Sequence, residues 1–182
     1  MNNPADIRFT SFSLLLIAFV GLLAGCAAPT TREGMIPASV ETTKKHPQTV
    51  SVSVTGGKET NPLWKSQISD TTFSEALVDA ITRSQVFSRV VQGKGGDYLL
   101  TVSLMSMSQP SFGASFTVSM EAGWSIQRAD TGAVVWQEAV RSSHTAKMGD
   151  AFVGAERLRL ATEGAAKNNI KQGLEKISAL SF

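Results

Sequence analysis

Cysteine is almost absent from this sequence, which contains only Cys26. A single thiol excludes internal disulfides and any zinc cluster built from thiolates. An excess of charge of one sign is also missing, because 17 Lys and Arg residues are set against 15 Asp and Glu residues, a formal net charge of +2. Binding to nucleic acid usually needs a basic patch or stripe, so the composition does not favour that partner. The other residues, 42% hydrophobic and 18% charged overall, are typical of a globular domain.

Residues that carry chemistry are also few. The only histidines are His46 and His144, and neither a Gly-x-Ser-x-Gly nor a His-x-x-x-His motif occurs. Nucleophilic catalysis needs a nucleophile, a base and a group that orients the base, and the sequence gives no clear set of these. We therefore predict a protein that is not an enzyme and holds no metal or cofactor. The alternative is a hydrolase in which His144 acts with Ser142, Ser143 and Asp150.

One hydrophobic run stands near the N-terminus. Its twelve residues, LLLIAFVGLLAG over 14–25, fall short of the roughly 20 residues that a membrane-spanning helix needs. They predict the apolar part of a signal peptide, residues 1–25. The run ends in Leu23-Ala24-Gly25-Cys26, which resembles the lipobox of bacterial lipoproteins. That resemblance implies cleavage before Cys26 and acyl chains on its sulfur and new amine; a plain secretory signal and an uncleaved anchor are the alternatives.

The residues after Cys26 determine where the anchor holds the chain. Two or more acyl chains keep a soluble domain on a bilayer, because each buried CH₂ contributes about 0.8 kcal/mol. Ala27 stands where enterobacterial lipoproteins retained in the inner membrane carry Asp, so the resemblance implies the outer membrane with the domain facing the periplasm. The inner membrane is the alternative. Residues 26–46, with Pro29, Gly34 and Pro37, predict a flexible tether before a domain over residues 47–182.

Hydrophobic periodicity predicts the elements of this domain. Alternation of apolar and polar residues predicts five strands, and a helical period predicts two helices. The strands are expected at 49–55, 86–92, 98–107, 116–128 and 133–142, and the helices at 70–84 and 152–179. Thr72 and Glu75 fit a capping box at the start of the first helix. The predicted fold is α+β, a two-layer sandwich of a mainly antiparallel sheet with both helices on one face, in the order β-α-β-β-β-β-α.

Two surface features are candidates for binding a partner. The first is the polar face of the predicted sheet, which carries Ser51, Ser53, Thr101, Ser103, Thr117, Ser119 and Ser125. Met105 and Met107 are expected to add adaptable apolar contact to that face, although it is equally consistent with an ordinary solvated surface. The second is the loop 108–115, in which Phe112 stands among Gly, Pro and Ser residues. Phe112 is either an exposed anchor for a partner or a side chain folded under the sheet.

The order of elements resembles the ABC-type transport auxiliary lipoproteins and the wider group of CsgG-like and TolB-N-terminal-like envelope domains, over roughly residues 47–180. The motifs are Phe73-x-x-x-Leu77-x-x-x-Ile81-x-x-Ser84-x-x-Phe87-x-x-Val90, Gly96-Asp97-Tyr98-x-Leu100-x-Val102 and Gly132-x-Val134-Val135-Trp136. The resemblance implies a non-catalytic accessory lipoprotein that binds an envelope protein. A regulator of cell-wall synthesis and a CsgG-like secretion component are the alternatives.

Overall fold

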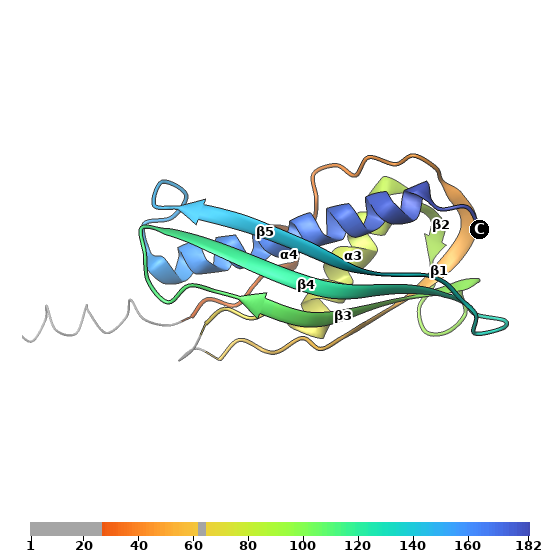
Figure 1. The fold of residues 1–182 in the computed structure, drawn as a ribbon, viewed down its shortest axis with the longest axis horizontal. Coiled ribbons are helices and arrows are strands. Elements are labelled where there is room, and N and C mark those ends of the chain that lie inside the picture. Colours follow the sequence, from red (N-terminus) through yellow and green to blue (C-terminus); the bar gives the residue numbers. More distant parts are fainter. Residues whose placement is uncertain (1–26, 62–64) are drawn as a thin grey trace, which may run out of the picture.

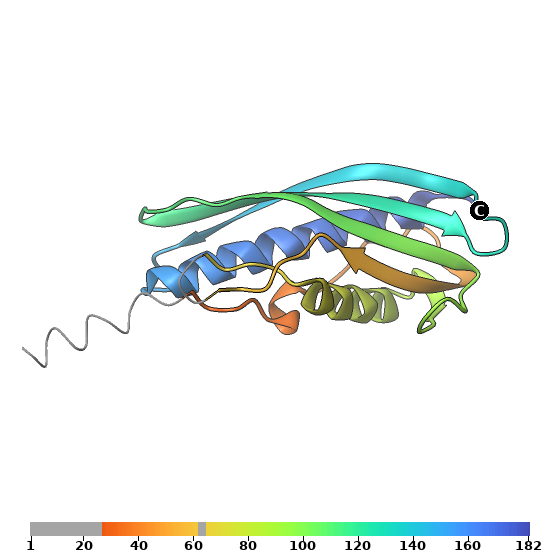
Figure 2. The ribbon, with the colours of Figure 1, turned by 90° about the horizontal axis from the view of Figure 1, so that it is seen from below.

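A five-stranded sheet runs along the length of the protein, and its helices lie on one face of that sheet (Figures 1 and 2). The computed structural model describes residues 27–61 and 65–182. The elements in chain order are α2 (Arg32–Met35), β1 (His46–Thr55), α3 (Asp70–Ser84), β2 (Phe87–Val90), β3 (Tyr98–Ser108), β4 (Ser115–Arg128), β5 (Val134–Lys147) and α4 (Gly154–Ala179). The fold is the predicted α+β sandwich, with the short α2 as a helix that the sequence did not predict.

The sheet has the order β2-β1-β3-β4-β5 and is mixed. β1 runs parallel to both of its neighbours, whereas β3, β4 and β5 are antiparallel. The two longest pairings are antiparallel, in line with the predicted, mainly antiparallel sheet. The parallel direction of β1 was not predicted, because alternation shows which face a side chain occupies but not the direction of its strand. Two connections make the parallel pairs. α3 links β1 to β2, and the turn after β2 passes over β1, where a Cβ on Gly96 would lie 2.6 Å from the backbone nitrogen of Ser51.

β4 supplies much of the sheet's contribution to the core. The alternate side chains on one face of this strand are all buried: Phe116, Val118, Met120, Ala122, Trp124 and Ile126. β5 pairs with β4 as far as Lys147, beyond its predicted end at Ser142. Val140 is buried, whereas Val134 is 53% exposed. The pairing shifts between Ile126 and Gln127, so Val134 lies opposite Gln127 on the other face.

The first long helix has the predicted bounds. The side chains of Phe73, Leu77 and Ile81 form its buried stripe. Its N-cap is Ser69, whose Oγ accepts a hydrogen bond from the Thr72 amide at 3.1 Å, so the predicted capping box is wrong. Over residues 27–61 and 65–182, no helix is long and apolar enough to cross a membrane.

α4 packs along β4 and β5 and buries one apolar stripe. That stripe comprises Leu158, Ala161, Ala165, Ile170, Leu174 and Ile177. Gly164 and Gly173, beside this stripe, bring the helix close to the sheet. Gly164 lies against the ring of His144, and Gly173 lies against the ring of Trp124. Trp124 Nε1 donates a hydrogen bond to Oδ1 of the fully buried Asn169 at 2.9 Å. This buried hydrogen bond therefore fixes the position of α4 along β4.

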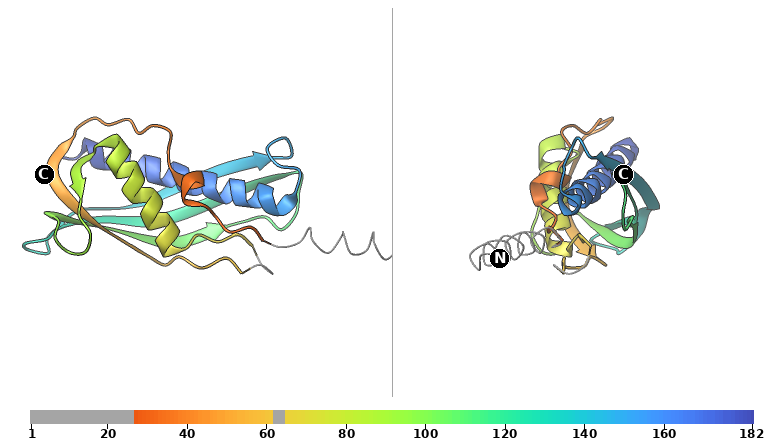
Figure 3. Two further views of the ribbon diagram at one scale, coloured as in Figure 1. Left: turned by 180° about the vertical axis from the view of Figure 1, so that it is seen from behind. Right: turned by 90° about the vertical axis from the view of Figure 1, so that its left-hand side faces the viewer.

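The segment before the sheet is packed, so the prediction of a flexible tether does not describe its residues 27–46. Figure 3 shows this segment crossing the outside of α3 and α4. Met35 is fully buried, and the Thr43 amide donates a hydrogen bond to Ser178 Oγ at 3.1 Å. His46 belongs to β1, and its buried ring places Nε2 3.0 Å from the carbonyl oxygen of Ile177. Composition alone misled here, because a few buried apolar residues are enough to hold a Pro- and Thr-rich segment against two helices.

Glu163 on α4 holds this segment in place. Its carboxylate, 3% exposed, accepts hydrogen bonds from the Thr31 amide at 2.6 Å and the Thr31 hydroxyl at 2.9 Å, and it pairs with Arg159 at 2.6 Å. Glu163→Ala is expected to lower the free energy of unfolding by about 1–3 kcal/mol and to release residues 27–36, because the amide and hydroxyl of Thr31 and the guanidinium of Arg159 lose their shared, buried acceptor. Amide hydrogen exchange over that segment measures the release. Glu156→Ala is the control, because Glu156 also pairs with Arg159 but is 41% exposed. Equal exchange in the two variants would contradict the assignment.

Candidate functional site

The candidate site is the sheet face turned away from the helices, here called the open face. α3 and α4 lie together on the opposite face (Figures 2 and 3), so no described helix covers this one. The hydroxyl side chains on this face of β1, β3, β4 and β5 include Ser53, Thr55, Thr101, Ser103, Ser106, Ser108, Thr117, Ser119, Ser125, Ser143 and Thr145. Some bond to one another across strands: Thr55 to Ser103 at 3.2 Å, and Thr117 to Thr145 at 2.8 Å. The others present donors and acceptors to solvent over a broad area.

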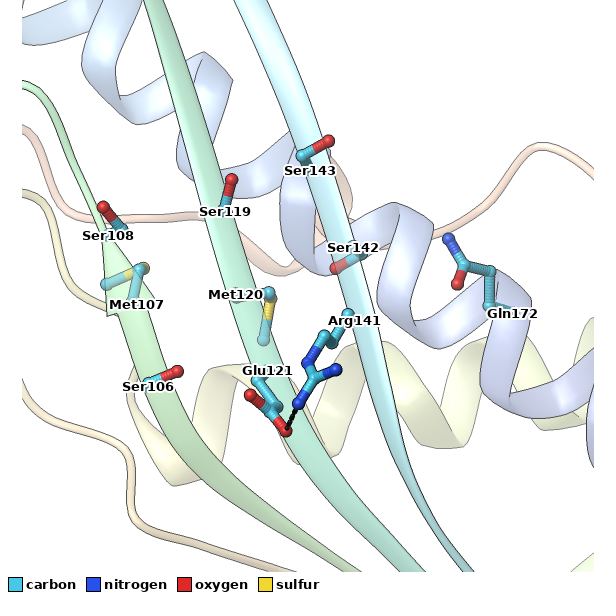
Figure 4. Close-up of a pocket in the computed structure, with 10 residues that line it drawn as sticks. All are labelled: Ser106, Met107, Ser108, Ser119, Met120, Glu121, Arg141, Ser142, Ser143 and Gln172. Atoms are coloured by element: carbon cyan, nitrogen blue, oxygen red, sulfur yellow. Dashed lines mark hydrogen bonds and ion pairs between the residues drawn. The ribbon is translucent and has the colours of Figure 1, made fainter.

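A shallow hollow of about 570 Å³ lies over the C-terminal end of β3 and the adjoining parts of β4 and β5 (Figure 4). Ser119 and Ser143 line it, together with an ion pair in which Arg141 donates to Glu121 Oε1 at 3.0 Å. The hydrogen bond to Glu121 raises the pKa of Arg141 above its ordinary value. The Arg141 side chain is 79% exposed, so this pair contributes little to stability and stays accessible to a partner.

Two features of the predicted open face are corrected by the structure. Ser51 is covered, because the Gly96 amide donates to its Oγ at 3.0 Å where the turn crosses β1. A β-bulge at Met105 shifts the pairing of β3 between Leu104 and Ser106, so Met105 and Met107 lie on different faces. Met105 is 62% exposed and lies over Gly123 on the open face, whereas Met107 packs against the core.

Phe112 is 87% exposed at the tip of the β3–β4 loop. This excludes the alternative in which its ring folds under the sheet. Cys26, the predicted acylation site, lies outside the described residues, and the description begins at the next residue, Ala27.

The side chains required by the hydrolase alternative do not converge. The His144 ring lies against Gly164 of α4, while Ser142 Oγ donates to the Ala165 carbonyl at 2.8 Å. Ser143 lies on the open face, and Asp150 accepts a hydrogen bond from the Lys147 amide at 2.7 Å. In the part of the chain that the structure describes, no cluster of three or more His, Cys, Asp or Glu side chains is suited to hold a metal ion.

Comparison with known proteins shows that the chain has the same fold as several solved bacterial proteins. Its sequence matches no family model and, at a significant level, no curated protein. The chain is similar in structure to protein XCC0632 of Xanthomonas campestris, described under the family DUF330, with a TM-score of 0.64, 9% identity, and coverage of 84% of this chain and 94% of that one. It is also similar to a minor lipoprotein of Acinetobacter baumannii (TM-score 0.51, 12% identity, 74% and 93% covered). A third is the PelC dodecamer of Paraburkholderia phytofirmans (TM-score 0.50, 14% identity, 79% and 95% covered). At these identities the likeness shows a common fold, and that fold occurs in bacterial lipoproteins.

Proposed function

We propose that the protein is a non-catalytic bacterial lipoprotein, anchored through Cys26 to the outer membrane with its domain in the periplasm. The lipobox Leu23-Ala24-Gly25-Cys26 and the fold in common with a minor lipoprotein support this proposal. The intact mass of the mature chain, which would begin at an acylated Cys26, tests the anchor.

We propose further that the protein is an accessory subunit of a transport or envelope-assembly system and binds its partner through the open face. The observation that carries this proposal is a sheet face of hydroxyl side chains that no described helix covers. Such a face suits a wet, hydrogen-bonded interface, to which Met105 adds apolar contact. The resemblance to ABC-type transport auxiliary lipoproteins supports the accessory role.

The second candidate is a component of a homo-oligomeric ring, of the CsgG-like secretion kind. The similarity to a dodecameric PelC favours this alternative. β5 supports it as well, because a long edge strand beside the open face suits pairing with a copy of the same chain.

Crosslinking in intact cells tests the accessory role. The photoreactive residue p-benzoylphenylalanine would replace Ser119 or Ser143 in the hollow, or Arg83 on the exposed side of α3 as the control. We expect adducts with one envelope protein from positions 119 and 143 and none from position 83, because only the open face meets the partner. Adducts between copies of this chain would instead favour the ring. The proposal fails if position 83 gives the same adducts as the two open-face positions.

A further inference from the structure

Two neighbouring loops at one end of the molecule expose large apolar side chains. Phe112 lies on the β3–β4 loop, and Met148, Phe152 and Val153 lie on the β5–α4 loop; both loops are at the left-hand end in Figure 1. Phe112 is 87% exposed and Phe152 is 86% exposed. We call these four residues the apolar pole. Scattered exposed apolar residues are ordinary on a soluble protein, but a group on two adjacent loop tips marks an interaction site.

A buried arginine joins the two loops. Arg157, 5% exposed, donates from Nη2 to the Gly113 carbonyl at 3.1 Å and from Nη1 to the carbonyls of Ala151 at 2.8 Å and Phe152 at 3.2 Å. Its guanidinium also lies 4.8 Å from the centre of the Phe116 ring. Three charge-assisted hydrogen bonds therefore fix the loops relative to each other and hold the apolar pole outward as one unit.

The N-terminal segment begins at the same end of the molecule. Ser66 Oγ donates to the Ala28 carbonyl at 2.6 Å, and Gln109 Nε2 donates to the Ser66 carbonyl at 2.7 Å. Gln109 immediately follows β3 and starts the loop that carries Phe112. Ala28 is two residues after Cys26, a separation that spans at most about 7 Å of extended chain. Acyl chains on Cys26 would thus enter a bilayer close to the apolar pole.

We infer that the apolar pole is a second membrane contact, in which Phe112 and Phe152 enter the interfacial layer of the bilayer that holds the acyl chains. This inference rests on the proposed anchor at Cys26. A bilayer fits the features better than a protein does, because protruding side chains on separate loop tips need a soft apolar phase rather than a matching groove. The exposed Lys147 next to Met148 suits anionic headgroups. Insertion would orient the strands roughly perpendicular to the membrane plane and leave the open face accessible to a protein partner.

Depth measurements on the acylated full chain test the inference. Acylation consumes the only native thiol, so Phe112→Cys or Phe152→Cys introduces a unique site for a polarity-sensitive fluorophore. Val134→Cys is the matched control, an apolar side chain that is 53% exposed at the other end of the sheet. In phosphatidylethanolamine–phosphatidylglycerol vesicles carrying a nitroxide near the headgroups, we expect loss of fluorescence at positions 112 and 152 and none at 134.

The other possible results of the quenching experiment distinguish the membrane contact from the anchor and from self-association. Co-flotation of the acylated protein with vesicles but no quenching at 112 or 152 would overturn the membrane contact and leave the anchor intact. Quenching at all three positions would also overturn it, because the protein would then lie flat. Quenching at 112 and 152 in a Cys26→Ser chain, which cannot be acylated, would support the contact independently of the anchor, which the intact mass of the mature chain tests separately. Protection of both labels without lipid, rising with protein concentration, would assign the apolar pole to a contact between copies.

Discussion

Gly173→Ala is expected to lower the free energy of unfolding by about 2 kcal/mol or more, although alanine is the better helix former by roughly 1 kcal/mol. The added Cβ would lie 2.5 Å from Cζ2 and 2.6 Å from Cε2 of Trp124. The ring cannot move aside, because Trp124 is fully buried and its Nε1 is bonded to Asn169. α4 would have to lift from the sheet. Urea denaturation of the mature protein measures the loss as a lower midpoint at unchanged slope.

Gly164→Ala is the matched control on the same helix. A Cβ at that position would overlap the ring of His144, but this side chain is exposed on the edge strand and is free to rotate into solvent. The gain in helix propensity is then unopposed, and we expect unchanged or higher stability by up to about 1 kcal/mol. Equal unfolding midpoints for the two alanine variants would show that the contact with Trp124 does not limit how closely α4 approaches the sheet.

The sequence predicted the parts of the fold that depend on one strand or one helix at a time. The alternation over β4 and the stripe of Phe73, Leu77 and Ile81 identify buried faces directly, and both are correct. The parallel pairing of β1 was missed because it depends on where the connections run. The packing of residues 27–46 was missed because its contacts, such as Thr31 with Glu163, join residues far apart in the chain.

The candidate site was predicted only where simple alternation along a single strand decides which face a side chain occupies. Ser103, Thr117 and Ser119 lie on the open face as expected, since simple alternation holds up to Leu104 on β3 and through this part of β4. One extra residue at the bulge then moves Met107 to the core side. Ser143 was missed as an open-face residue because the predicted strand ended at residue 142, whereas β5 continues to Lys147. Phe152 was missed as an exposed loop residue because the predicted helix began at residue 152, whereas α4 begins at Gly154.

Asn169→Ala is the second substitution expected to have a large effect, a loss of about 2–4 kcal/mol in the free energy of unfolding. Asn169 is fully buried, and its Oδ1 accepts the hydrogen bond from Trp124. Its Nδ2 donates to the Val140 carbonyl at 2.9 Å and to Ser142 Oγ at 3.2 Å. Alanine would leave the indole N–H unpaired in the core and open a cavity between α4 and the sheet.

The neighbouring residue supplies the control for this substitution. Asn168 Nδ2 also donates to β5, at 2.8 Å from the Ser143 carbonyl, but this bond is open to solvent, so water replaces it in Asn168→Ala. We expect a change within about 0.5 kcal/mol for that variant. Asn169→Leu would restore volume but not the acceptor for Trp124, so it should recover only part of the loss in urea denaturation. Full recovery by leucine would mean that packing, rather than the hydrogen bonds of Asn169, holds α4 to the strands behind the open face.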